Sequence, residues 1–213
     1  VNLRKAPLSG VTLRLTELSG ADTRGVLTDR PAARALEELG GPLNALLVQH
    51  TDWIESASAT GCRLDISGYD MRAAGDLGGV DMTAVLATGT IWCGLDLSGS
   101  RFAAGRLIDS DFRFAVLRDA DMRGVDMRQA RLRNACLAGA DLRSLVLGEG
   151  RKLRTRLSGC DLRYADLTGA KLRDADLCDA DLSNAKLDGA DLRGAHLAGA
   201  SLPDNLTAVA RTS

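Results

Sequence analysis

A five-residue repeat runs through most of this chain and limits what it can fold into. From Gly75 to Asp204 the sequence divides into 26 consecutive blocks of five residues without a break in register. The third position of a block is Leu, Met or Phe except in three blocks, where Ala87, Trp92 and Lys152 occupy it. A unit of five residues cannot bury its own apolar side chains, so we expect the blocks to bury them by stacking on one another.

Each block has the pattern of a short extended segment followed by a corner. Alternate side chains of an extended backbone point to opposite faces, so positions one and three face one way and position two the other. Gly is frequent at position five, where it tolerates the positive φ of a tight turn. We therefore predict Ala and Leu inside and Asp and Arg outside. The predicted core leucines are Leu142, Leu162, Leu167, Leu172, Leu177, Leu182, Leu187 and Leu192.

The blocks ADLRG, ADLSN and ADLTG resemble the repeats of the pentapeptide-repeat family. The resemblance implies an all-β solenoid, a right-handed quadrilateral β-helix in which four blocks, about 20 residues, make one coil. It also implies a protein that acts through its surface, since most members of this family have no known activity beyond such a role.

Four segments are predicted along the chain. Residues 1–25 carry the same five-residue pattern and form an N-terminal pentapeptide coil. Residues 26–63 interrupt it as a helical insertion, residues 64–204 form the main β-helix, and residues 205–213 form a C-terminal tail or cap. Inside the insertion we expect a helical hairpin. Its first helix is capped by Thr28 or Asp29 and stops at Gly40-Gly41, and its second opens at Pro42 and is amphipathic.

Two irregularities interrupt the repeat. Ala74 is one extra residue, which indicates a bulged corner. Lys152 stands where an inward Leu belongs, and an unpaired lysine is costly to bury. We expect the segment 148–156 to bulge outward, either as a tolerated irregularity or as a protrusion that binds a partner.

If every coil has four blocks, each fourth block lies on the same wall of the β-helix. One wall then carries Asp121, Asp141, Asp161 and Asp181 in a column with arginines beside it. A second wall collects nine basic residues against three acidic ones, and arginine suits bidentate contacts with carboxylates. This basic stripe is the candidate partner-binding surface, formed by Arg113, Arg131, Arg133, Arg151, Arg154, Lys171, Arg173 and Arg193.

The residues of catalytic and metal sites are sparse. The two histidines, His50 and His196, are far apart in the sequence, and we interpret them as a packing residue and a solvated one. The five cysteines form no CxxC pair, which favours free thiols in a reducing cytoplasm. No stretch is long and apolar enough to span a membrane. We expect no enzyme activity, no cofactor and no metal.

The leading functional prediction is a bacterial, non-catalytic scaffold for protein–protein interaction, with an acidic partner for the basic stripe. One alternative comes from the branch of the family that mimics DNA, binds gyrase or topoisomerase IV and protects it from quinolones or toxins. The formal net charge of −1 argues against it, because mimicry of DNA needs a strongly acidic surface. A second alternative is an adaptor of a secretion or toxin system, which stays open because the sequence starts at Val1 and not at Met. Nucleic acid is an unfavoured partner, since aromatic residues are only 3% of the chain.

Overall fold

The computed structural model describes residues 33–204. The chain divides after Ala33 into two units, and the secondary structure described below lies in the second, Arg34–Ser213. The predicted coil at 1–25, the predicted helix start at Thr28 or Asp29 and the tail at 205–213 lie outside the described residues.

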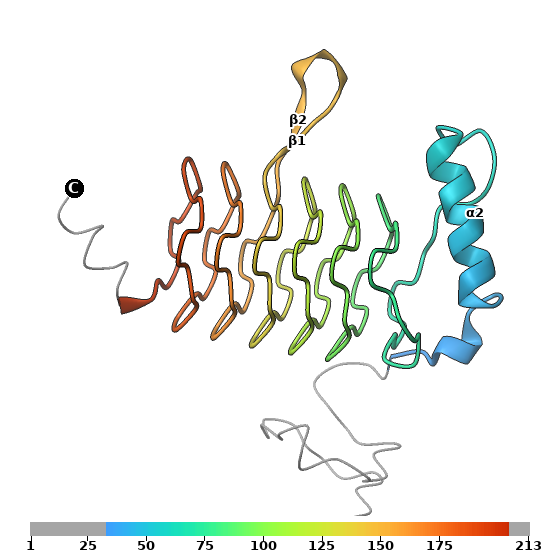
Figure 1. Ribbon diagram of the computed structural model, residues 1–213, viewed down its shortest axis with the longest axis horizontal. Coiled ribbons are helices and arrows are strands. Elements are labelled where there is room, and N and C mark those ends of the chain that lie inside the picture. Colours follow the sequence, from blue (N-terminus) through green and yellow to red (C-terminus); the bar gives the residue numbers. More distant parts are fainter. Residues whose placement is uncertain (1–32, 205–213) are drawn as a thin grey trace, which may run out of the picture. The chain divides into compact units, whose positions relative to one another are not determined.

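Within the described residues, stacked coils run from Leu64 to Asp204 (Figure 1). Isolated parallel bridges join each coil to the next, and most partners are separated by four blocks, as in Asp81–Arg101 and Arg101–Asp121. Outside the hairpin, bridging residues recur once in nearly every block, so a coil of four blocks contributes to four ladders. The bridges stay isolated because only the second residue of a block pairs before the chain turns again.

A tight turn forms each corner. The carbonyl of Leu97 accepts from the amide of Ser100 at 3.1 Å, and Gly99 between them has φ of 66°. The amide of Leu97 donates to the carbonyl of Val116 in the next coil at 2.7 Å. The backbone N–H and C=O groups at the corners therefore form hydrogen bonds partly within a coil and partly with the next coil. Position five takes the left-handed conformation.

The first and third positions of the blocks fill the core. Of the eight leucines named above, Leu192 in the last coil is only partly buried, while the other seven are buried. In the early coils the core is aromatic: Trp92 stacks on Phe112 at 5.7 Å between ring centroids, and Phe102 meets both edge-on. Inward hydroxyl groups are also paired, since Ser100 Oγ donates to the carbonyl of Leu77 at 2.8 Å.

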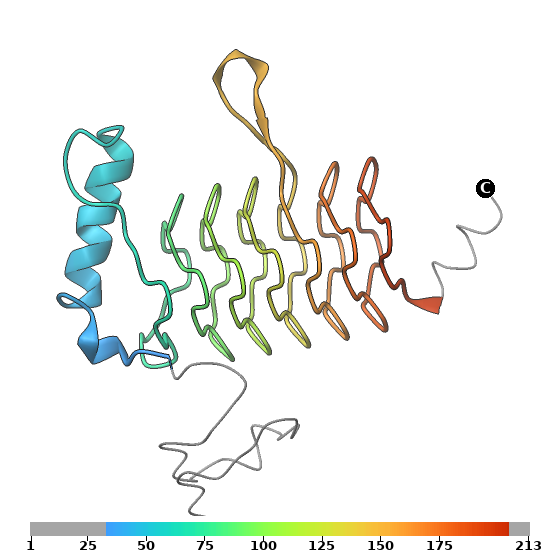
Figure 2. The same ribbon diagram turned by 180° about the vertical axis from the view of Figure 1, so that it is seen from behind.

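The N-terminal end of the stack is covered by helix α2, Leu43–Glu55 (Figure 2). The predicted hairpin of two helices is wrong in its first half, because Leu36–Glu38 makes only a single 3-10 turn, η1. Its end at Leu39 is extended, and Gly40-Gly41 then leads into α2. The predicted second helix is α2, whose His50 is fully buried and accepts the amide of Leu64 on Nδ1 at 3.0 Å.

A hairpin projects from the middle of the stack (Figure 1). Strand β1, Leu145–Val146, pairs antiparallel with strand β2, Lys152–Leu153, and the 3-10 turn η2, Gly148–Gly150, joins them. Bridge partners on either side of this hairpin are separated by six blocks instead of four, as in Asp141–Lys171, so the hairpin adds two blocks to one coil. The extra residue Ala74 also lengthens its coil, but only by one residue, as the bridge Asp70–Ile91 shows.

Candidate interaction surfaces

The four ladders define four walls, which we name by their bridging residues. Wall A carries Asp81, Arg101, Asp121, Asp141, Lys171 and Asp191. Wall B carries Leu86, Arg106, Asp126, Arg156, Asp176 and His196. Wall C carries Asp70, Ile91, Asp111, Arg131, Asp161, Asp181 and Ser201. Wall D carries Asp96, Val116, Cys136, Asp166 and Lys186.

The basic stripe expected from the sequence is not one surface. Arg113, Arg131 and Arg133 lie on wall C, whereas Lys171, Arg173 and Arg193 lie on wall A. Arg151 and Arg154 belong to the hairpin and to the chain that returns from it. The expected column of aspartates is also divided between two walls: Asp121 and Asp141 lie on wall A, while Asp161 and Asp181 lie on wall C. The cause is the two-block insertion, which moves every later block by two walls.

With the walls assigned from the bridges, charge is nearly balanced on three of them. The outward positions are the second, fourth and fifth of each block from Tyr69 to Asp204, outside residues 145–154. At these positions wall A has six basic and five acidic residues, wall B has three basic and four acidic, and wall C has five of each. Wall D has two basic and five acidic residues, a net charge of −3. No wall of the stack carries the excess of nine basic residues over three acidic ones that the sequence pattern predicted.

A local Asp-x-Arg pair accounts for much of this balance. In the block 120–124, the carboxylate of Asp121 accepts from the backbone amide of Arg123 at 3.2 Å and from its guanidinium at 2.6 and 2.8 Å. Burial alone would raise the pKa of Asp121, but these hydrogen bonds outweigh it and lower the pKa. On the last coil the guanidinium of Arg193 lowers the pKa of Asp191 to about 2. Such pairs leave the carboxylates ionised and internally satisfied, which is unsuited to acid–base catalysis.

The hairpin is an exposed irregular feature of the described chain. Its tip presents Val146 at 64% and Leu147 at 41% exposure, although the repeat pattern places Leu147 inside. Arg151, Lys152 and Arg154 are exposed on the returning strand, and Glu149 is the acidic residue of the turn. The hairpin therefore combines apolar and cationic side chains outside the stack.

The base of the hairpin is anchored to the coils. Thr155 is fully buried, and its Oγ1 donates to the carbonyl of Arg143 and accepts the amide of Gly124, both at 2.8 Å. A Cβ on Gly124 would lie 2.8 Å from the Cβ of Leu145 and 3.1 Å from the side chain of Leu153. The absence of a side chain at Gly124 thus lets the two strands leave the stack side by side.

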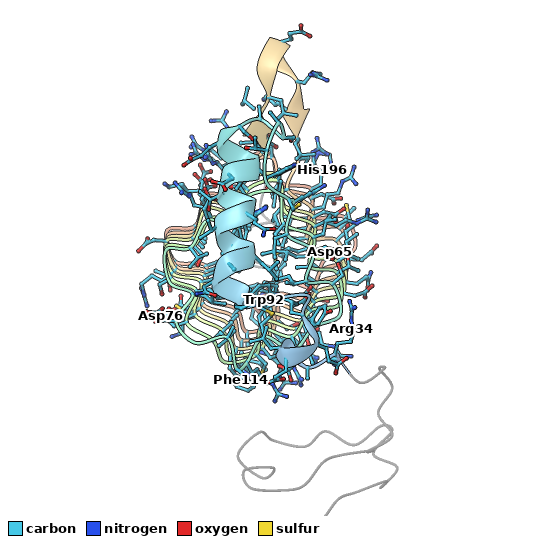
Figure 3. The ribbon with its side chains drawn as sticks, turned by 90° about the vertical axis from the view of Figure 1, so that its right-hand side faces the viewer. Arg34, Asp65, Asp76, Trp92, Phe114 and His196 are labelled. Atoms are coloured by element: carbon cyan, nitrogen blue, oxygen red, sulfur yellow. The ribbon has the colours of Figure 1, made fainter. Side chains whose placement is uncertain are left out.

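An aromatic feature on wall C was missed by the sequence reasoning. Phe114 and Tyr164 end blocks of this wall at position five, and they are 48% and 50% exposed. Figure 3 shows Phe114 at a corner of the stack, away from Trp92 in the interior. The signal was present in the blocks SDFRF and CDLRY, where an aromatic residue stands at a corner that elsewhere holds small or polar residues.

The histidines and cysteines are not gathered into a site. Burial lowers the pKa of His50, and exposed His196 lies 3.5 Å from Arg154 Nη1. All five cysteines are free, and burial raises the pKa of the Cys160 thiol to about 12. Within residues 33–204 no group of three or more His, Cys, Asp or Glu is placed to hold a metal ion. In that same part of the chain, no helix is long and apolar enough to cross a membrane.

Coils that are joined by four ladders of parallel bridges, with short-range ion pairs and a protruding hairpin, define a repeat protein built of stacked coils. The sequence model of the family described as pentapeptide repeats matches eight copies, in residues 106–143, 154–179 and 175–204. The matched segments leave out residues 144–153, where the hairpin lies. The chain belongs to the pentapeptide-repeat family.

Several solved structures are similar to this chain. HetL, a pentapeptide repeat protein involved in heterocyst differentiation regulation in the cyanobacterium Nostoc sp. PCC 7120, is 24% identical, with 66% of this chain and 83% of HetL covered and a TM-score of 0.37. A pentapeptide repeat protein of the Arabidopsis thaliana thylakoid lumen is 30% identical, with 55% and 74% covered and a TM-score of 0.28. QnrB1, a plasmid-mediated fluoroquinolone resistance protein, is 21% identical, with 65% and 72% covered and a TM-score of 0.32. No curated protein matches the chain.

Proposed function

We propose that this protein is a non-catalytic scaffold that binds another protein through the hairpin at residues 145–154. The observation that carries the proposal is the hairpin itself, which is anchored at Thr155 and exposes Val146 and Leu147 beside three cationic side chains. Exposed apolar groups with a charged rim are typical of interaction sites. The partner surface that fits them is an apolar pocket bordered by carboxylates.

The proposal also places the protein in the bacterial cytoplasm and gives the coil a right-handed sense. Five free thiols suit a reducing bacterial cytoplasm, and the right-handed sense of the coil is the one that the family implies. Interaction with gyrase is the less favoured function. It is considered because QnrB1, a similar structure, is a fluoroquinolone resistance protein. Only wall D has a clear acidic surplus, whereas a mimic of DNA would present dense negative charge. An adaptor role in a secretion or toxin system is a special case of the scaffold and would use the same hairpin.

Deletion of residues 145–154 tests the proposal without breaking the repeat. The deletion removes two whole blocks and joins ADLRS directly to TRLSG, so the coil that carries the hairpin takes the regular length of four blocks. We expect the shortened protein to keep its thermal midpoint and to lose capture of the partner that immobilised full-length protein retains from a bacterial lysate. A partner retained equally by both proteins would contradict the proposal.

Two charge reversals with the same change in net charge locate the contact. Replacing Arg151, Lys152 and Arg154 by Glu should abolish capture, whereas replacing Lys171, Arg173 and Arg193 on wall A should leave it intact. The opposite pattern would assign the interaction to wall A. A gyrase supercoiling assay with the same variants checks the less favoured function, which gains support if the full-length protein inhibits or protects the enzyme.

A further inference from the structure

One corner of the stack, which we call the aromatic corner, consists of Phe114, Asn134, Tyr164 and Asn184. These residues hold position five in four consecutive coils of wall C. Their register is set by backbone hydrogen bonds from one corner to the next coil: the amide of Phe114 donates to the carbonyl of Arg133, and that of Tyr164 to the carbonyl of Ser183, both at 3.2 Å. All four side chains are exposed.

The two aromatic residues are not explained by folding. Phe114 has φ of 62° and Tyr164 φ of 60°, the left-handed region that a bulky side chain adopts only at a cost. Glycine fills this position without strain at many other corners, including Gly94 on the same wall. About half of each side chain remains in solvent, so burial in the core does not offset the cost of the left-handed backbone at either residue. Strain and exposure at the same two residues point to a role in binding.

The chemistry around the rings is cationic. Each of Phe114, Asn134 and Tyr164 follows directly after an arginine. Arg113 and Arg163 are paired with Asp111 and Asp161, both at 2.7 Å, but among the described residues no ion pair within 4.0 Å joins Arg131 or Arg133 to an acid. The guanidinium carbon of Arg133 lies 5.3 Å from the ring centroid of Tyr164. The coil between the two rings therefore carries a net positive charge next to an ordered aromatic face.

The spacing of the rings selects a ligand conformation. Phe114 and Tyr164 are two coils apart, which corresponds to about 9.6 Å at the spacing of neighbouring strands. A polyproline II helix repeats every three residues and rises about 9.3 Å per turn. Proline rings on one face of such a helix would thus meet both aromatic side chains in turn. Its carbonyl groups have no internal partners, and the amide of Asn134 lies between the rings to donate to them.

We propose that the aromatic corner binds an acidic, proline-rich segment in the polyproline II conformation, lying along the stack. Prolines contact Phe114 and Tyr164, and a carboxylate in the turn between them pairs with Arg131 and Arg133. This surface is distinct from the hairpin, which leaves the stack at the opposite side in Figure 3. The proposal shares with the proposed function only the statement that the chain binds proteins.

Binding of a fluorescent peptide of Pro-Pro-Glu repeats, followed by anisotropy, tests the proposal. The intact chain should bind this peptide and should bind Pro-Pro-Lys or Gly-Gly-Glu repeats at least about tenfold more weakly. Added salt should reduce the preference for Glu over Lys, because the guanidinium groups are only partly buried. Equal binding of the three peptides, or no binding of any, would overturn the proposal.

Glycine substitutions separate a binding role from a structural one. Phe114→Gly with Tyr164→Gly relieves two positive-φ residues, so the thermal midpoint should stay or rise while peptide affinity falls roughly tenfold or more. Gln129→Gly makes the same change at a corner of wall B, where φ is 63°, and should leave peptide affinity unchanged. Deletion of residues 145–154 should also leave it unchanged, so that failure of the hairpin proposal and failure of this one are told apart. If the double glycine variant loses self-association of the chain but not peptide binding, the corner joins copies of the chain and the proposal is wrong.

Discussion

His50 is the residue at which the helical cap depends most directly on protonation. It is fully buried, accepts the Leu64 amide on Nδ1, and stacks on Trp53 with 5.8 Å between ring centroids. Burial lowers its pKa, and nearby Arg63 acts in the same direction, while a backbone hydrogen bond at Thr83 and the charge of Asp81 oppose them. The folded protein therefore keeps this imidazole neutral at a pH where the unfolded chain begins to bind a proton.

We predict that the cap loses stability as the pH falls below about 6.5, the ordinary pKa of histidine. The sign follows from linkage: the folded-state pKa of His50 is lowered, so its contribution is complete above the unfolded pKa and declines as the unfolded state takes up protons. Urea unfolding followed by tryptophan fluorescence between about pH 5.5 and pH 7.5 measures it. His50→Gln should flatten the profile in that range, whereas the exposed His196→Gln should not. An unchanged profile in His50→Gln would assign the pH dependence to another group.

At the scale of the element, the hairpin depends on the glycine beneath it. Gly124 has φ of 65°, and a Cβ there would meet Leu145 at 2.8 Å. Gly169 offers a matched comparison, because its φ is 66° and nothing lies within 4 Å of the position of its Cβ. The difference between the two sites is therefore the contact with the base of the hairpin.

We expect Gly124→Ala to destabilise the protein more than Gly169→Ala. Both should incur about 1–2 kcal/mol for a non-glycine residue in the left-handed region, and only Gly124→Ala adds the clash with the hairpin. Chemical denaturation gives the two differences in unfolding free energy. In the protein lacking residues 145–154 the two substitutions should cost the same, and a difference that persists there would mean that Gly124 is constrained by something other than the hairpin.

For the molecule as a whole, the sequence predicts the inside and the outside of the stack better than the wall on which a residue lies. The alternation within a block places Leu177 inside and Asp121 outside, and both are found there. The wall of a block depends on the length of every preceding coil. The insertion consists of two whole blocks, so the five-residue register continues unbroken through LVLGE and GRKLR while the walls exchange. Lys152 at an inward position was the one visible sign of the insertion.

Two further differences between the prediction and the structure remain. The segment before α2 was expected to be a helix that stops at Gly40-Gly41, but Leu39 is extended and buried instead of completing a helical turn. The blocks SDFRF and CDLRY each show an aromatic residue at position five, but the aromatic corner was missed because its four residues belong to four different coils and come together only once the coils are stacked. Candidate sites on such a stack of coils are therefore found from the walls, after the length of each coil is known.

Because each coil contacts only its neighbours, a defect in the core should spread along the stack and weaken with distance. Leu177 is fully buried in the C-terminal half, and replacing such a leucine by Ala costs about 2–5 kcal/mol in other cores. Leu177→Asp should cost more, since it places a carboxylate among apolar side chains. We predict that it removes amide protection from hydrogen exchange over residues 155–204 while residues 80–140 keep most of theirs.

The control for this substitution is Ala198→Asp, which adds the same charge at an exposed position of wall B and should leave exchange and melting almost unchanged. Equal loss of protection in both halves of the Leu177→Asp protein would mean that the stack unfolds as one cooperative unit. Loss confined to the C-terminal coils would mean that the N-terminal coils, with Trp92, Phe102 and Phe112 packed together in their core, hold their structure independently. In that case the boundary between folded and unfolded coils passes through the aromatic corner, because Phe114 would stay ordered while Tyr164 would not. A ligand that contacts both residues should then restore protection from hydrogen exchange to the C-terminal coils.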